Sequence, residues 1–154
     1  GPGGRLDLAF GRVLAAVAQA RASDAKVALD SLEAIGNVVT DIEKKSGEAD
    51  PTYRVRPQIM LLEGQGLLAE QQGAVNKAES FLRQAVDMEQ TLPVAFGPPT
   101  IDKPTHELLG EFLLRQQRYD EAKAEFEKAL ARTPKRRLAE EGLKQATAGV
   151  SRVG

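Results

Sequence analysis

The sequence contains no cysteine and only one histidine, His106. The first absence excludes disulfide bonds and thiolate metal sites, and the second excludes a metal site built from several imidazoles. We therefore expect no metal ion, and no motif in the sequence indicates a cofactor.

Aromatic residues are also scarce, with no tryptophan, two tyrosines and five phenylalanines. At a net charge of −1, the chain lacks both the stacking surface and the basic charge that are typical of nucleic-acid binding. No apolar run approaches the roughly 20 residues of a membrane-spanning helix, so we expect no membrane insertion. What the chain does have is 42% apolar residues over 154 positions, which is enough for the core of a single domain, 1–154.

Small and large residues recur at defined intervals in the segment 103–136, at Gly110, Ala122, Phe126, Ala129 and Pro134. Apolar residues around the glycine, such as Leu109 and Leu113, follow the period of a helix rather than that of a strand. We expect one helix over 104–117 and a second over 119–132. A glycine inside a helix costs about 1 kcal/mol relative to alanine, and it is expected where another segment approaches closely.

The segment 103–136 resembles a tetratricopeptide repeat (TPR), because these five residues stand at marker positions of that family. It departs from the family where His106 and Leu113 replace large aromatic residues. The resemblance implies antiparallel helix pairs that stack into a right-handed superhelix and bind other proteins. The chain is similar to the C-terminal repeat region of larger bacterial proteins of this kind. The compartment stays unknown, because the bacterial cytoplasm and the periplasm both tolerate a chain without cysteine.

The same spacing recurs upstream in the segment 58–92, at the packing markers Gly66, Ala78, Leu82 and Ala85. We expect helices over 58–72 and 75–90. Repetition of a period is the main sequence signature of a repeat architecture. Residues 93–102 separate the two copies and contain three prolines, so we expect an insertion without helix there.

The remaining segments also carry helical periodicity. We expect a diverged helix pair within 5–45, over 6–22 and 24–45 with Asp24 as N-cap, followed by a polar linker over 46–57. Thr133 and Pro134 are expected to start a further helix as its N-cap and first residue. The capping helix of the stack would cover 137–150.

The expected fold is all-α, a short right-handed superhelix of about three helix pairs plus a capping helix. The first four residues, Gly-Pro-Gly-Gly, are typical of a vector remnant, so we expect a trimmed chain.

In the TPR family, the first helices of successive repeats line a concave groove that holds the ligand. The resemblance assigns the groove to Met60, Glu63, Leu67, Glu70, Glu107, Glu111, Leu114, Arg115, Glu141 and Gln145, with Leu138 beside them. Members that grip a carboxylate terminus carry lysine and asparagine where this chain has Glu63 and Glu107. A basic or amphipathic peptide would suit such an acidic groove better. The alternative is an ordinary solvated surface with helical ion pairs such as Glu111–Arg115.

Two further features are open to more than one interpretation. His106 lies beside Glu107, and the three-residue combination with Glu111 could in principle bind a metal or transfer protons. Packing or hydrogen bonding of His106 is the simpler interpretation. The basic run 135–137 lies where a helix dipole disfavours cations, so it is either functional or a solvated turn.

The sequence therefore favours a non-enzymatic protein-interaction module that binds a peptide or protein segment in the groove. The first alternative is a self-associating scaffold segment of a longer bacterial protein, and a homo-oligomer is compatible with it. The second is a metal-binding or catalytic site near His106. No nucleophile–base pair, phosphate loop or metal signature in the sequence supports the second alternative.

Overall fold

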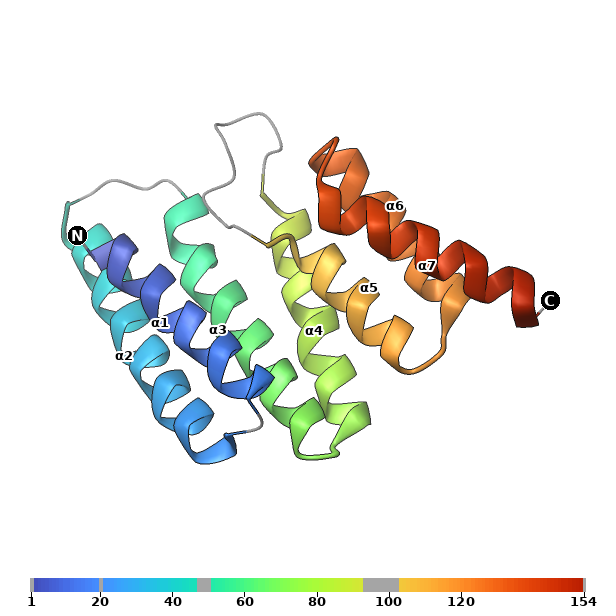
Figure 1. Cartoon of the computed structure of the whole chain (residues 1–154). Coiled ribbons are helices and arrows are strands. Elements are labelled where there is room, and N and C mark those ends of the chain that lie inside the picture. The colour runs from blue at the N-terminus through green and yellow to red at the C-terminus, as the bar shows by residue number, and fades with distance from the viewer. Residues whose placement is uncertain (1, 20, 47–50, 93–102, 154) are drawn as a thin grey trace. The chain divides into compact units, whose positions relative to one another are not determined.

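The computed structural model describes residues 2–19, 21–46, 51–92 and 103–153, and all their regular structure is α-helical. The predicted all-α fold is thus confirmed. The helices are α1 (Pro2–Ala18), α2 (Ala22–Ser46), α3 (Pro51–Gln71), α4 (Val75–Gln90), α5 (Thr105–Arg115), α6 (Tyr119–Arg132) and α7 (Arg137–Val153) (Figure 1). Within these ranges, no helix is long and apolar enough to cross a membrane.

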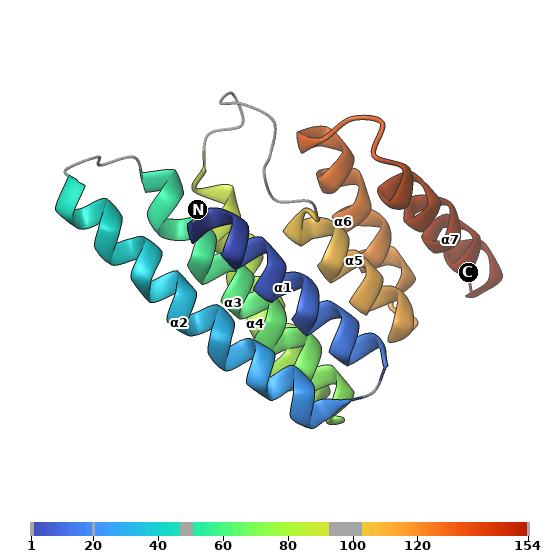
Figure 2. The same cartoon turned by 60° about the vertical axis from the view of Figure 1, so that its left-hand side comes forward.

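The chain divides into two compact units, Gly1–Leu92 and Pro93–Gly154. In the N-terminal unit each helix packs against the next, and α1 also packs against α3. In the C-terminal unit α5 packs against α6, and α6 packs against α7 (Figure 2). The helix α5 also packs against α7. Both units thus place the first helices of successive pairs in contact, and α7 occupies the position of the first helix of a further pair. The single-domain organisation stays a prediction.

Phe126 forms the centre of the C-terminal unit, where α5, α6 and α7 meet. Its ring is fully buried between two glycines, Gly110 of α5 and Gly142 of α7. A Cβ added at Gly110 would lie 2.9 Å from the ring, and one added at Gly142 would lie closer still. Leu82 has the corresponding position in the N-terminal unit, where a Cβ added at Gly66 would lie 2.8 Å from it. Both units therefore pack a large side chain of the second helix onto a glycine of the first.

The helices α4 and α6 begin and end at the expected residues, whereas α1 and α2 begin earlier than expected. Pro2 can open α1 because the first residue of a helix needs no N–H donor. Ala22 opens α2, so Asp24 lies in the first helical turn and not at the N-cap. Negative charge is favourable at either position, because both are close to the positive end of the helix dipole.

The expected linker 46–57 is helical from Pro51 onward, since α3 begins there and contains Pro57. A proline inside a helix removes one backbone hydrogen bond. The ring of Pro57 is buried and faces α2, where a Cβ added at Gly36 would lie 3.0 Å from the Cβ of Pro57. Close packing of Pro57 on α2 offsets the missing hydrogen bond. The sequence around Pro57 does not indicate this packing, because it depends on another helix.

The end of the repeat also differs from the expectation. Pro104 is the N-cap of α5, which ends at Arg115 instead of continuing to residue 117. Thr133 is the C-cap of α6 and does not start the next helix. Lys135 has a φ of 65°, in the left-handed region, so the chain turns there and α7 begins only at Arg137 and continues to Val153.

Candidate functional site

Glu107 in the first turn of α5 is fully buried and is held by cations from two other segments of the C-terminal unit. Nε of Arg136 donates to Oε1 of Glu107 at 2.7 Å, and Nη2 donates to Oε2 at 3.0 Å. Nζ of Lys103 lies 3.0 Å from Oε2 of the same carboxylate. A buried carboxylate is tolerated only when it is paired in this way. The bidentate contact ties the turn between α6 and α7 to the first helix of the repeat.

The expectation that Glu107 presents negative charge to a ligand is therefore wrong, because its charge is buried and neutralised. Lys103 also contacts Oε2 of Glu111 at 2.9 Å, so this second carboxylate is paired as well. Arg136 has a structural contact, whereas Arg137 forms an exposed pair with Glu141 at 3.3 Å. Within the basic run 135–137, Arg136 therefore holds the turn against α5, whereas Arg137 lies in solvent.

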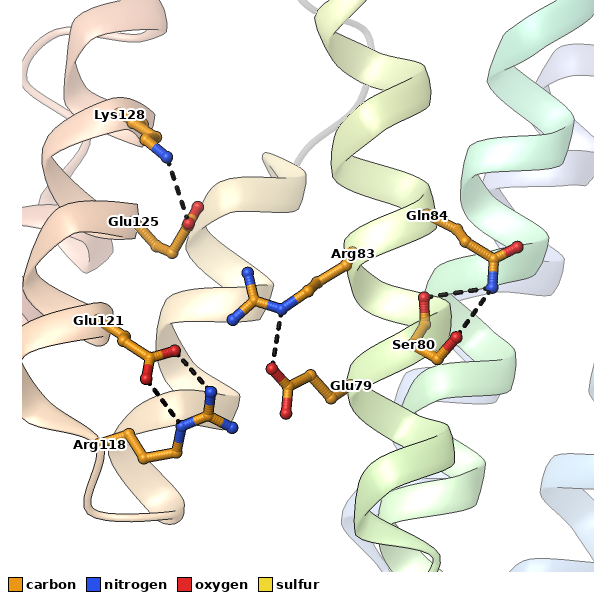
Figure 3. A network of polar contacts seen from close by, with 8 residues as sticks. All are labelled: Glu79, Ser80, Arg83, Gln84, Arg118, Glu121, Glu125 and Lys128. Carbon is orange, nitrogen blue, oxygen red and sulfur yellow. Dashed lines mark hydrogen bonds and ion pairs between the residues drawn. The ribbon is translucent and has the colours of Figure 1, made fainter.

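His106 forms a second buried polar contact between α5 and α6. Its Nδ1 lies 2.6 Å from Oε2 of Glu125, and both side chains are buried. Lys128 approaches the other oxygen of Glu125 at 3.5 Å, as Figure 3 shows. Burial alone would raise the pKa of Glu125, but hydrogen bonding and charge from His106, with Lys128, hold that pKa below its usual value. The contact binds α6 to α5, as the packing interpretation of His106 expects.

Two further ion pairs join residues three or four positions apart, one in each unit. Arg118 donates to Glu121 at the start of α6, and Arg83 donates to Glu79 within α4 at 2.8 Å (Figure 3). Among the described residues, no group of three or more histidine, aspartate or glutamate side chains could hold a metal ion. The two ion pairs have the i,i+3 and i,i+4 spacings that stabilise single helices.

The groove positions expected on α3 are mostly covered. Met60 is 2% exposed, Glu63 is 0% exposed and Leu67 is 8% exposed, and only Glu70 is partly accessible. Within the N-terminal unit α3 packs against α1, α2 and α4, so three neighbours surround it. The expectation that Met60, Glu63 and Leu67 offer an open binding surface is therefore wrong for this helix.

The positions expected on α5 and α7 are more accessible. On α5, Glu111 and Leu114 are partly exposed and Arg115 is exposed. The positions on α7 are all exposed: Leu138, Glu141 and Gln145. We call this set the α5–α7 face: Glu111, Leu114, Arg115, Leu138, Glu141 and Gln145. Because α5 and α7 pack against each other, the set belongs to two neighbouring helices of one unit.

Several residues that shape this unit were missed by sequence reasoning. The pairs Arg136–Glu107 and His106–Glu125 join residues far apart in the sequence, and nothing in the local pattern indicates them. Gly142 and Gly149, by contrast, stand seven residues apart in one helix, and this spacing was a usable signal of close packing. Gly149 lies against the ring of Tyr119, as Gly142 lies against Phe126.

The comparison with protein families gives one finding. The family model described as "Tetratricopeptide repeat" matches residues 104–136, which include α5, α6 and the turn to α7. No curated protein and no solved structure gave a match. Repeats of this family generally mediate protein–protein interaction and are typically non-enzymatic. The buried Phe126, its glycine partner on the first helix and the match together identify residues 104–136 as a tetratricopeptide repeat.

Proposed function

We propose that this chain is a non-enzymatic protein-interaction module that binds a peptide or protein segment on the α5–α7 face. The observation that carries the proposal is the repeat at 104–136, followed by α7 in the place of another first helix. First helices are the ligand-binding elements of such repeats. The side-by-side packing of α5 and α7 supports their use as one surface.

The chemistry of the face favours an amphipathic segment. Leu138 is 47% exposed and supplies apolar contact area, while Arg115 and Glu141 supply charges of both signs. The ion pair between Arg137 and Glu141 is highly exposed and contributes little to stability, so a ligand can replace it at small cost. Because Glu107 and Glu111 are already paired, the face is less acidic than the sequence predicted.

The surroundings of the face support a preformed surface. Arg136 on Glu107 and Phe126 between its two glycines fix α7 against the repeat. A surface that is already ordered loses less conformational entropy on binding than a flexible one. We therefore expect binding without a large rearrangement of this unit.

The proposal can be tested by selecting binders from a displayed library of random peptides with the whole chain as bait. Two variants change the face, Leu138→Glu and Glu141→Lys. Two matched controls also place glutamate at an exposed apolar position and lysine at an exposed glutamate, Val38→Glu on α2 and Glu127→Lys on α6. All four positions are exposed. Selected peptides should lose about tenfold or more in affinity for the face variants and keep their affinity for the controls.

Equal binding to all four variants would place the ligand elsewhere and contradict the α5–α7 assignment. Failure to select any peptide with wild type, under conditions where a known repeat protein yields binders, would contradict the interaction function itself. Circular dichroism of each variant establishes that the helices are retained.

Self-association is the second candidate, and one observation favours it. The outer side of α7 forms a shallow surface pocket of about 560 Å³, to which Leu143, Thr147 and Ala148 contribute. A second copy that packs there would continue the helix order of the unit. Sedimentation equilibrium at increasing concentration checks this candidate, and a monomer throughout removes it.

A further inference from the structure

A groove runs between α1 and α2 in the N-terminal unit, far in sequence from the repeat at 104–136. It encloses about 660 Å³ and is formed by one stripe of residues from each helix. The α1 stripe contains Arg5, Leu8, Arg12, Ala15 and Gln19, which recur every three or four residues. The α2 stripe contains Asp24, Ala28, Ser31 and Ile35 with the same period. We call this feature the α1–α2 groove; the two helices lie side by side in both Figure 1 and Figure 2.

The floor of the groove is apolar and built from small side chains. Ala9 and Ala16 are buried at its base, 5% and 9% exposed. Leu8 and Val27 are large apolar side chains of the lining, yet they are 59% and 67% exposed. Single exposed apolar residues are ordinary, but two that line the same depression mark a surface suited to burial by a partner.

The charge of the lining has one sign. Arg21 and Asp24 form an exposed ion pair at 2.5 Å and largely neutralise each other. Arg5 and Arg12 are exposed, and neither forms an ion pair with any residue that the structure describes. The uncompensated charge of the groove is therefore positive, and it comes from two arginines seven residues apart on one face of α1.

The shape of the groove suits a helix. The α1 stripe from Arg5 to Gln19 extends along about 21 Å of the helix axis, which corresponds to about four helical turns. Small residues at Ala15, Ala28 and Ser31 allow a third helix to approach at the usual interaxial separation of about 8–10 Å. A membrane surface is broad and flat, and it would contact the rims more readily than a floor between two helices.

We propose that the α1–α2 groove binds an acidic amphipathic helix of another protein. Its apolar stripe would cover the alanine floor with Leu8 and Val27, and acidic side chains seven residues apart would face Arg5 and Arg12. The lining of the α7 pocket has one acid, Glu140, and one base, Lys144, so this surface of a second copy would offer the arginines little charge complementarity. This site is separate from the α5–α7 face and does not depend on the function proposed for it.

The test uses the whole chain and a designed probe, a fluorescein-labelled helical peptide of about 18 residues, long enough to span the groove. The probe carries leucine and alanine at helical spacing and glutamates seven residues apart beside that stripe. One control peptide has lysine in place of these glutamates, and a second has the composition of the probe in scrambled order. Fluorescence anisotropy should show binding of the probe, with both controls at least about tenfold weaker.

Protein variants then locate the contact. Arg5→Glu combined with Arg12→Glu should weaken probe binding at least about tenfold, because two attractive contacts become repulsive. The matched control, Lys44→Glu combined with Lys77→Glu, makes the same change of charge at exposed positions outside the groove and should bind like wild type. Ser31→Phe fills the groove without a change of charge and should also abolish binding. Because these positions are exposed, the helical circular dichroism should persist.

Other outcomes would overturn the proposal. Equal affinity for the glutamate and lysine peptides would exclude charge recognition, and equal loss in both double variants would exclude the groove as its location. Concentration-dependent dimerisation that Arg5→Glu with Arg12→Glu removes would assign the groove to a second copy. Binding to anionic phospholipid vesicles without binding of the probe would assign the arginines to a lipid surface. None of these results bears on the variants of the α5–α7 face.

Discussion

The position of Phe126 shows how a single residue determines the packing of three helices. Gly110 and Gly142 let the backbones of α5 and α7 approach the same edge of its ring, and Ala122 and Ala129 are buried with it on α6. Any added carbon at either glycine must displace an aromatic ring that has little space to move. The interior is close-packed, so such a displacement is opposed by all neighbouring side chains.

Gly142→Ala should therefore destabilise the protein by about 1–3 kcal/mol, the usual cost of overpacking a core. Urea denaturation followed by circular dichroism measures it. The matched control is Gly11→Ala on α1, where an added Cβ would have nothing within 4 Å. That variant should gain about 0.5–1 kcal/mol from helix propensity. If the two variants were equally stable, the close contact between Phe126 and α7 would be wrong.

The lowered pKa of Glu125 determines the sign of its contribution to the pH dependence of stability. Because its pKa is lowered in the folded state, its contribution to stability is present above the unfolded pKa and is lost as pH falls through the folded pKa. The melting temperature of wild type should exceed that of Glu125→Gln near neutral pH. The difference should shrink as pH is lowered from about 6 to about 3, the range that contains glutamate titration. A constant difference over this range would contradict the role of the Glu125 charge.

At the scale of elements, the contact of Arg136 with Glu107 determines where α7 lies relative to α5. Loss of Arg136 leaves a fully buried carboxylate with Lys103 as its remaining cation in the C-terminal unit. The turn between α6 and α7 contains Lys135 in the left-handed conformation. The ion pair of the next residue, Arg136, with Glu107 holds this turn against α5. Helix propensity alone does not specify this geometry.

Arg136→Met should cost about 1–3 kcal/mol, because the buried carboxylate of Glu107 loses its bidentate donor and keeps the contact with Lys103. The double variant with Glu107→Gln should cost less than the sum of the two single variants, with a coupling of about 1–3 kcal/mol. Denaturation of all four proteins measures the cycle. The equivalent cycle for Arg137 and Glu141, an exposed pair, should give a coupling near zero. Similar couplings in both cycles would argue against a special role for Arg136.

The helix α3 should be the most protected element of the N-terminal unit. Three neighbouring helices cover it, whereas α1 and α2 each have an exposed groove face. Its amides, between Ile59 and Ala69, should exchange more slowly than those of α1 in native-state hydrogen exchange. Exchange at α1 that is as slow as at α3 would show that the groove face is covered in solution, for example by a second copy.

At the scale of the whole molecule, the two proposed binding surfaces lie on different units and differ in chemistry. The α5–α7 face has charges of both signs, and the α1–α2 groove is basic. Rim charges mainly affect association rate and salt dependence, so binding at the groove should weaken more steeply with added salt. Anisotropy titrations of the acidic probe and of a selected peptide, each at several salt concentrations, check this difference. Equal salt dependence would contradict the charge assignment of the groove.

The sequence by itself determined the helix pairs and the repeat, but it did not determine where α1, α2 and α3 begin. Hydrophobic periodicity is a local property of a helix, so α4 and α6 could be placed to the residue, and Gly110 with Phe126 predicted the close pair that the family match supports. Gly142 was readable in principle, because a glycine inside a helix has a propensity cost that packing must offset.

Only the tertiary structure decided which polar side chains are available to a partner. Glu63, Glu107 and Glu141 belong to the same predicted groove, yet the first two are fully buried and the third is exposed. Burial depends on what packs against a helix, and Arg136 reaches Glu107 from 29 residues along the chain. Likewise, the α1–α2 groove exists because two stripes from separate helices face each other, whereas helical periodicity describes one helix at a time.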